Sequence, residues 1–156
     1  MQFEVRPSAV EELAAGEPGA VAAENARRKA LAVAGPLVLG ADTVVALDGA
    51  ILGKPGDAAQ AVDYVTRLAG RTHDVVGGIA LARDGAVFAE AVEVTQVTFR
   101  ALTAAEVEAY VALSEWEGRA GGYAIQGRGA ALVRSISGDY LNVVGLPLAR
   151  LLDLLH

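Results

Sequence analysis

The amino-acid sequence predicts an α/β or α+β fold, in which helices flank a twisted, mixed β-sheet. Three observations lead to this class. Helical and extended segments alternate along the chain, Asp-Gly pairs at 48–49 and 84–85 are typical of tight hairpin turns, and capping-box patterns at Asp57 and Thr103 mark helix starts. Because the chain has 156 residues, 53% of them hydrophobic, it is long enough to bury a core. We expect residues 1–156 to form one domain.

The first half of the chain is predicted to contain strands and two helices. Residues 3–7, FEVRP, indicate a short strand, and the alanine-rich segment 20–34 indicates a helix that ends at Gly35 and Pro36. The apolar run at 37–47 predicts a strand or two. A second helix is then expected from the capping box at Asp57 to about Ala69.

The second half is predicted to begin with strands in residues 72–100, where apolar residues alternate with polar ones. The capping box of Thr103 and Glu106 opens a helix to about Leu113. Residues 116–129 are dense in glycine, which lets a backbone approach a ligand closely. Residues 143–156 predict a last helix, with Pro147 near its first turn.

Composition excludes several classes of function. The formal net charge is -6 and no basic face is evident, which argues against binding a nucleic-acid duplex. No apolar run approaches the roughly 20 residues needed to cross a bilayer, and no signal-peptide pattern is present. The sequence therefore predicts a cytoplasmic protein that binds neither membranes nor nucleic acids.

Composition also limits the metals that the chain can bind. The sequence has no cysteine and only two histidines, so thiolate sites are excluded and a histidine-rich zinc site is disfavoured. A metal would be a hard cation held by carboxylates.

Four ionisable residues stand at predicted element boundaries: Glu12, Lys29, Asp42 and Lys54. Two carboxylates can hold Mg²⁺, and two lysines can neutralise the phosphates that complete its coordination. A buried unpaired carboxylate is costly, so Asp42 is expected at a strand end or beside a cationic partner. The alternatives are a solvated Glu12, an exposed helix charge at Lys29, and an Asp42 that only caps the next turn.

The two lysines are unusual in this chain, because the other eleven of its thirteen basic residues are arginine. Lysine is a compact point charge that can address a phosphate without the guanidinium fork.

The sequence resembles the Maf family of nucleoside triphosphate pyrophosphatases. The resemblance runs through most of the chain, in the motifs FEVRPSAVEE, ARRKA, GADTVV, ILGKP, GRTHDVV, AGGYAIQG and GDYLNVVGLPL. It implies a Maf/ITPase-like fold. It also implies hydrolysis of a nucleoside triphosphate between its α and β phosphates with Mg²⁺ or Mn²⁺, and a homodimer.

Carried over to this sequence, the resemblance assigns the metal and the phosphates to the four charged residues. Glu12 becomes a metal or water-orienting carboxylate, and Asp42 the metal ligand or the general base that activates water. Lys29 and Lys54 hold the triphosphate.

The resemblance also implies which residues contact the base. AIQG is similar to the form of the family that prefers dTTP, UTP and modified pyrimidine nucleotides, in which Gln126 and Thr43 help to read the base. Arg71 and His73 fall in the GRTH motif and are candidates for substrate contact, with a structural hydrogen bond as the alternative for His73.

Two departures from the family pattern bear on function. Family members begin with a strand, an S-x-S-P-R-R motif and a helix, and this sequence contains none of them. Either the true protein is longer than this sequence, or we expect a shortened domain that lacks the first strand and helix of the family and part of its phosphate clamp. Arg119 stands where the family commonly has a lysine, which is expected to change nucleotide preference, with a plain loop charge as the alternative.

Three hypotheses follow for function. The first is a pyrophosphatase that destroys excess or modified pyrimidine nucleoside triphosphates. The second is a non-catalytic nucleotide-binding or septum-formation regulatory protein, and the third is an enzyme acting on purine triphosphates.

Overall fold

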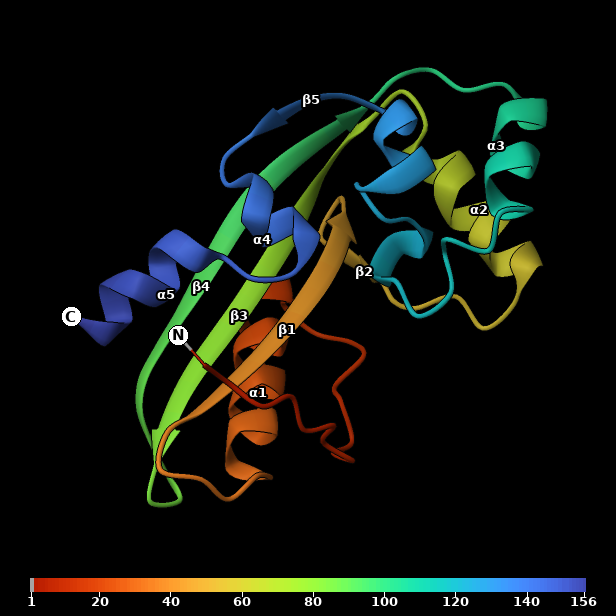
Figure 1. The fold of residues 1–156 in the computed structure, drawn as a ribbon. Helices are drawn as coiled ribbons and strands as arrows, with labels where there is room; N and C mark the ends of the chain where they lie inside the picture. Colours follow the sequence, from red (N-terminus) through yellow and green to blue (C-terminus); the bar gives the residue numbers. More distant parts are fainter. Residues whose placement is uncertain (1) are drawn as a thin grey trace.

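The computed structural model describes residues 2–156, in which helices cover both faces of a five-stranded sheet (Figure 1). The strand order is β2-β1-β3-β4-β5. The strands are β1 (Val38–Leu47), β2 (Ala50–Leu52), β3 (Thr72–Arg83), β4 (Ala86–Phe99) and β5 (Val133–Ser137). The helices are α1 (Pro18–Leu31), α2 (Ala58–Leu68), α3 (Ala104–Val111), α4 (Tyr140–Val144) and α5 (Leu148–Leu155), with 3-10 helices η1 (Ala120–Gly122) and η2 (Gly127–Leu132).

The predicted class of helices flanking a sheet is confirmed, but the strand directions differ from the mixed arrangement expected. Every pairing among the described strands is antiparallel. Two of the pairs are the predicted Asp-Gly hairpins, in which Asp48, Gly49, Asp84 and Gly85 all have positive φ. Turns of this kind join neighbouring strands in opposite directions, whereas parallel neighbours need a longer crossover.

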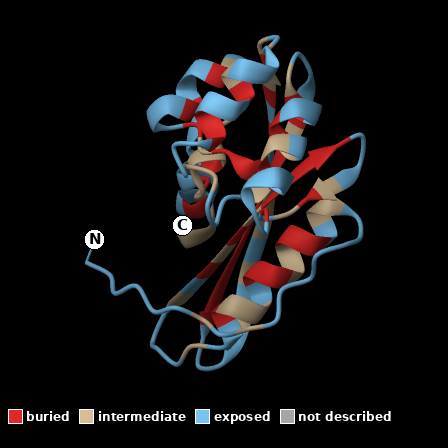
Figure 2. Ribbon diagram, turned by 90° about the vertical axis from the view of Figure 1, so that its right-hand side faces the viewer, coloured by how far each residue is buried: buried red, intermediate tan, exposed pale blue. Residues whose placement is uncertain are grey.

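Both ends of the chain differ from the prediction. Residues 3–7 form no strand but extended coil, with Phe3 82% and Val5 79% exposed (Figure 2). The predicted last helix is two helices, because Gly145 adopts φ 137° after α4 and α5 begins only after Pro147. An apolar pattern does not show whether a segment has a neighbouring strand to pair with, which residues 3–7 lack. It also does not show that a glycine interrupts a helix, as Gly145 does.

Helix α1 packs unusually close to the sheet. A Cβ atom at Gly40 of β1 would overlap with the carbonyl oxygen of Ala26, and one at Gly78 of β3 would overlap with that of Ala22. Because these glycines have no side chain and the facing helix residues are small, the backbones of helix and sheet approach each other closely. The polar residues of α1 are thereby brought within hydrogen-bonding distance of β1.

Helices α4 and α5 cover the opposite face of the sheet. Leu151 of α5 packs with Ile79 and Leu81 of β3, while Asn142 of α4 is fully buried against Gly77. The Asn142 amide nitrogen donates to the Val75 carbonyl oxygen at 3.0 Å. This contact fixes α4 over the middle of the sheet.

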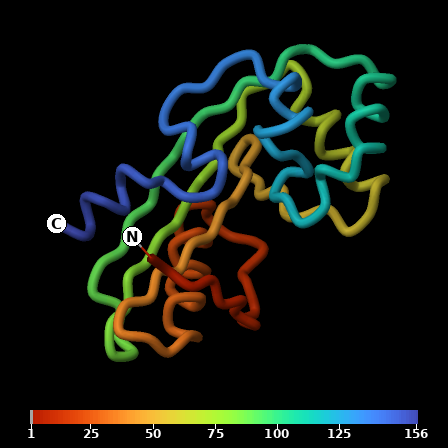
Figure 3. Tube along the Cα trace, viewed as in Figure 1, coloured from red at the N-terminus to blue at the C-terminus, as the bar shows by residue number. Residues whose placement is uncertain are grey.

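The largest hydrophobic core lies at one end of the sheet, where α2, α3 and the 3-10 helices gather beyond β1 and β3 (Figure 3). Its largest fully buried side chains are Phe99, Leu52, Leu68, Val65, Val75, Val97 and Val107. Both predicted helix starts lie in this region, and the reciprocal capping box of Thr103 and Glu106 is complete. At Asp57 only half of the predicted box is present, because Asp57 accepts from the Gln60 N–H while the Gln60 side chain accepts from Gly56. Within residues 2–156, none of the helices has the length and apolar character needed to span a bilayer.

Candidate active site

Asp42 lies in the middle of β1 and not at a strand end, which corrects one of the two positions expected for it. Its side chain faces α1 and the residue is only 8% exposed. Lys29 donates to Asp42 Oδ1 at 2.7 Å, and the Asn25 amide donates to Oδ2 at 3.0 Å. The predicted cationic partner is therefore confirmed, and these bonds join Asp42 to α1 instead of capping a turn.

Glu12 is held beside this carboxylate although it lies in coil. The Leu13 backbone N–H donates to Asn25 Oδ1 at 2.7 Å, and the Asn25 amide donates back to the Leu13 carbonyl at 3.1 Å. Arg28 donates to the carbonyl oxygen of Glu11 at 2.9 Å. Because two residues of α1 bind the backbone on each side of Glu12, its carboxylate has a defined position.

The four predicted charges form one cluster. Lys29 Nζ is 2.9 Å from Glu12 Oε1, in addition to its contact with Asp42, and Lys54 Nζ is 3.8 Å from Glu12 Oε2. Burial favours neutral forms, but the opposite charges outweigh it, so the pKa of Glu12 is lowered and that of Lys29 is raised. Both groups are thus charged at neutral pH.

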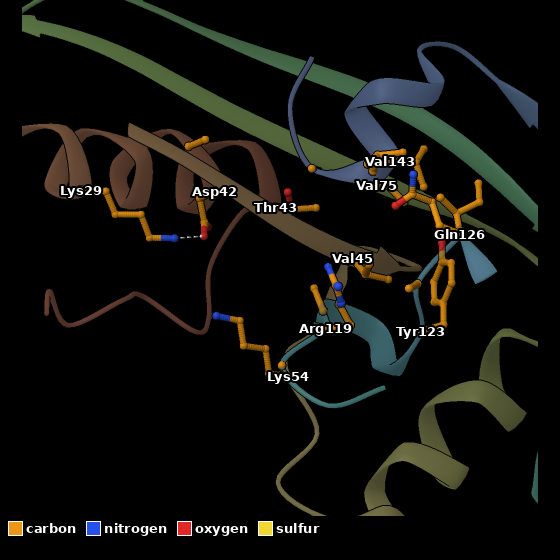
Figure 4. Close-up of a pocket in the computed structure, with 17 residues that line it drawn as sticks. Lys29, Asp42, Thr43, Val45, Lys54, Val75, Arg119, Tyr123, Gln126 and Val143 are labelled. Carbon is orange, nitrogen blue, oxygen red and sulfur yellow. Dashed lines mark hydrogen bonds and ion pairs between the residues drawn. The ribbon is translucent and has the colours of Figure 1, made fainter. Parts of the chain in front are cut away.

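An open cavity adjoins this cluster (Figure 4). Lys29, Asp42 and Lys54 line one end, and Lys54 extends its ammonium group toward the other two. Thr43, the next residue of β1, lines the cavity beyond Asp42. The volume is about 240 Å³, below the roughly 300 Å³ of the smallest typical ligand pockets.

The other end of the cavity is less charged. Gln126, Tyr123, Val75 and Val143 line it, and Figure 4 shows the Gln126 carboxamide beside Val75 and Val143. Apolar walls with one carboxamide suit a planar heterocycle with donors and acceptors on its edge.

Arg119 lies between the two ends of the cavity, with its guanidinium group directed toward Thr43. Arg119, which stands where the family pattern commonly has a lysine, is therefore part of the cavity wall. An arginine here presents a planar fork of donors, where a lysine would present a point charge.

Arg71 and His73 do not line this cavity. Arg71 forms an exposed ion pair with Asp48, with its Nη2 2.6 Å from Asp48 Oδ2. His73 is buried, and its Nε2 lies 2.6 Å from the hydroxyl oxygen of Tyr123. His73 therefore forms a structural hydrogen bond, which was the alternative to contact with the substrate.

The His73–Tyr123 pair forms the support beneath the cavity wall. The rings of Phe99, His73 and Tyr123 pack edge to face, with centroids 4.7 to 5.5 Å apart. Burial lowers the pKa of His73 to about 4 and raises that of Tyr123, so both are neutral at pH 7. A neutral, tightly packed pair gives Tyr123 little freedom to move.

Sequence interpretation missed several residues that shape the site. Asn25 links the backbone of Leu13, which follows Glu12, to Asp42. Its signal was available, since Asn25 and Lys29 are four residues apart and share one face of a helix. Val143, Val144 and Gly145 also line the cavity, carried there by α4. The sequence offered no comparable signal for these three, because their approach depends on tertiary packing.

Glu12 and Asp42 are the two carboxylates of the cluster that could hold a divalent cation. Glu12 and Asp42 both approach the same ammonium group, at 2.9 and 2.7 Å, so their oxygens already converge on a point that favours positive charge. The described residues contain no cluster of three or more histidine, cysteine, aspartate or glutamate side chains suited to a metal. Two hard oxygen donors fit Mg²⁺ or Mn²⁺ that takes its other ligands from water and phosphate.

Comparisons with known proteins show the family to which the chain belongs. The family described as Maf-like protein matches residues 1–156. A dTTP/UTP pyrophosphatase of Symbiobacterium thermophilum is 48% identical, over 90% of this chain and 74% of its own length. Proteins of the same name from Moorella thermoacetica and Bacillus cytotoxicus are 43% and 47% identical, over 99% and 96% of this chain and 84% and 81% of their own lengths. The chain therefore belongs to the Maf family.

Proposed function

We propose that this protein is a nucleoside triphosphate pyrophosphatase that hydrolyses dTTP, UTP and modified pyrimidine nucleotides to the monophosphate and pyrophosphate, and that residues 1–156 act as one Maf-like domain. The observation that carries the proposal is the cluster of Glu12, Lys29, Asp42 and Lys54 at the mouth of a cavity whose other end carries Gln126. Relatives that are 43 to 48% identical are named dTTP/UTP pyrophosphatases.

In this proposal the charged end binds the triphosphate. Lys54 is the more available of the two lysines, because its side chain is 55% exposed and its contact with Glu12 is 3.8 Å long. Lys29 shares its charge between two carboxylates and is 20% exposed. We assign Lys54 to capturing the phosphates and Lys29 to orienting them. Arg119 adds a third cation between the phosphates and the base.

The base occupies the less charged end. The Gln126 carboxamide offers one acceptor and two donors, which suit the carbonyl and N–H edge of thymine or uracil. Thr43 assists from β1, and Tyr123 supplies an apolar wall. Because Arg71 and His73 lie outside the cavity lining, we assign His73 to supporting Tyr123 and give Arg71 no base contact.

The reaction is a displacement at the α phosphorus. Water attacks that phosphorus, the bond to the oxygen bridging the α and β phosphorus atoms breaks, and pyrophosphate leaves. In this proposal Asp42 either accepts the proton of the attacking water or ligates the metal. Its hydrogen bonds with Asn25 and Lys29 support both roles, because they fix the orientation of the carboxylate. Mg²⁺ or Mn²⁺ held by Glu12 and Asp42 would neutralise charge on the phosphates.

A panel of nucleotides tests the proposed function. Incubation of the protein with dTTP, UTP, dATP and GTP and Mg²⁺, followed by identification of the products, is expected to give monophosphate and pyrophosphate, fastest from dTTP and UTP. Chelation of the metal should stop the reaction. Faster release from dATP and GTP would indicate a purine-directed enzyme. Nucleotide binding by calorimetry without turnover would contradict hydrolysis and favour a binding protein.

We also propose that the protein is a homodimer, as the family resemblance implies. Light scattering at several concentrations is expected to give twice the chain mass of 16.0 kDa. A mass that stays at 16.0 kDa at all concentrations would contradict this assembly.

A further inference from the structure

The residue proposed to read the base stands where helices usually need a side-chain cap. Gln126 is the N-cap residue of η2, and its side chain makes no capping hydrogen bond. The first backbone N–H groups of a helix lack partners within the helix, and the N-cap side chain usually accepts from one of them. If the Gln126 carboxamide served as this cap, it would turn away from the cavity that it lines.

A carboxylate from another segment takes over the capping role. Glu115 follows α3 and accepts from two backbone N–H groups of η2, that of Arg128 at 3.0 Å on Oε1 and that of Gly129 at 3.1 Å on Oε2. These are the donors that an N-cap side chain would satisfy. Gly127, which precedes both donors, has φ 66°, and a Cβ at this position would come within 2.8 Å of Glu115 Oε1. The glycine turn therefore accommodates this carboxylate.

The chain on the other side of Gln126 is also held. The Ala124 backbone N–H donates to the hydroxyl oxygen of Tyr110 at 3.1 Å, and Tyr110 lies buried on α3. A Cβ at Gly129 would overlap with the Ala124 carbonyl oxygen, so the two ends of this short loop pack together. Gln126 thus projects from a loop that is closed on itself and anchored to α3 and the segment after it.

We propose that Glu115 is a positioning residue for base recognition, which caps η2 in place of Gln126 and leaves the Gln126 carboxamide free to face the base. The inference rests on the proposed function, in which Gln126 reads the base. It assigns to Glu115 a role in specificity without contact with the nucleotide. Glu115 lines no part of the cavity.

A double-mutant cycle tests this role. Glu115→Ala, Gln126→Ala and the double variant are compared by the ratio of kcat/KM for dTTP to that for dATP. We expect Glu115→Ala to lower this ratio about 10- to 100-fold, since a small misplacement of a recognition group has effects of this order. The double variant should match Gln126→Ala, because residues that act through one another are not additive. Equal losses for both nucleotides, or additive losses, would overturn the inference.

Glu117→Ala is the matched control, because Glu117 lies in the same segment, is exposed and belongs to none of the hydrogen bonds to η2. It should leave the ratio unchanged. Glu115→Gln keeps one acceptor oxygen and should recover part of the ratio lost in Glu115→Ala. A control variant that lowers the ratio as much as Glu115→Ala would show a general effect of loop charge, and would also overturn the inference.

Amide hydrogen exchange gives a readout that does not depend on catalysis. The N–H groups of Arg128 and Gly129 should lose protection in Glu115→Ala and keep it in Glu117→Ala. Unchanged protection in Glu115→Ala would overturn the anchoring role. Absence of pyrophosphate release from the unmodified protein would instead contradict the proposed function, so the two failures are distinguishable.

Discussion

At the scale of single residues, the two lysines of the site have different environments, and this difference predicts different phenotypes. Lys54→Met removes an exposed ammonium group whose one ion pair is 3.8 Å long, so the free energy of unfolding should change by less than about 0.5 kcal/mol. The loss of a charged phosphate contact, worth about 1.5 kcal/mol, should raise the KM for dTTP roughly tenfold. Steady-state kinetics and thermal unfolding measure the two effects.

Lys29→Met should affect stability as well as turnover. It leaves Asp42, with 7% of its side chain exposed, and Glu12 without their shared cation. Because the cluster is partly solvated, we expect destabilisation of about 2 kcal/mol, less than that for a fully buried pair. Thermal unfolding should show a lowered Tm for Lys29→Met and an unchanged one for Lys54→Met. The same Tm for both variants would contradict this account of the cluster.

Residues of the candidate site could be predicted from the sequence where they stand in a recognisable motif. The four charges of the cluster were identified because they stand in distinctive motifs, and Gln126 for the same reason. Asn25 was missed although it lies one turn before Lys29 on the same helix face. Glu115 was missed because its partners are backbone N–H groups of η2, which only the fold brings close to it. Arg71 illustrates the opposite case, since a residue in a family motif pairs with Asp48 outside the cavity.

At the scale of elements, the packing of α1 on β1 and β3 determines the geometry of the cluster. Gly40→Ala should destabilise the protein by about 3 kcal/mol, because the new methyl group overlaps with the Ala26 carbonyl oxygen and the helix must shift. The shift also moves Lys29 away from Asp42, so pyrophosphate release should fall. Urea unfolding measures the stability change.

Gly53→Ala is the control for this prediction, because a Cβ at Gly53 meets no atom within 4 Å and φ is not in the left-handed region. We expect its free energy of unfolding to stay within about 0.5 kcal/mol of the unmodified protein. If Gly40→Ala is as stable as Gly53→Ala, close packing of α1 does not hold the site together.

Elements with local signals were predicted well, and those that depend on distant partners were not. The two Asp-Gly hairpins and the capping box at Thr103 are encoded in short stretches, and all three are present. The strand expected at 3–7 is coil, because a strand exists only where a neighbour pairs with it. The strand-end position expected for Asp42 was wrong for a similar reason. Its place within β1 depends on the Lys29 ammonium group, which only the fold brings close.

At the scale of the whole molecule, the burial of His73 predicts how the free energy of unfolding depends on pH. Its pKa is about 4 in the folded protein because of burial, against 6.5 for an exposed histidine. Between these values the unfolded chain binds a proton that the folded chain does not. Stability is therefore highest above pH 6.5 and falls as the pH is lowered, by about 2 kcal/mol at pH 5. Glu12 contributes little in this range, because its ordinary pKa of 4.5 and its lowered pKa in the folded protein both lie below pH 5.

Urea unfolding at pH 7.5 and pH 5 checks this prediction in two variants. His73→Gln should remove most of the difference between the two pH values, whatever its own stability. His156→Gln should retain it, because His156, the other histidine of the chain, lies exposed after α5. An unchanged pH dependence in His73→Gln would show that another group is responsible.

The catalytic role of Asp42 can be tested by measuring pyrophosphate release from dTTP with Mg²⁺ in Asp42→Asn. This change keeps the shape of the side chain and removes the charge that pairs with Lys29. Asp63→Asn is the control, because Asp63 is an exposed residue of α2 outside the cavity lining. We predict a rate about 10²- to 10⁴-fold lower for Asp42→Asn and an unchanged rate for Asp63→Asn. Full turnover by Asp42→Asn would contradict the assignment of the reaction to this cluster.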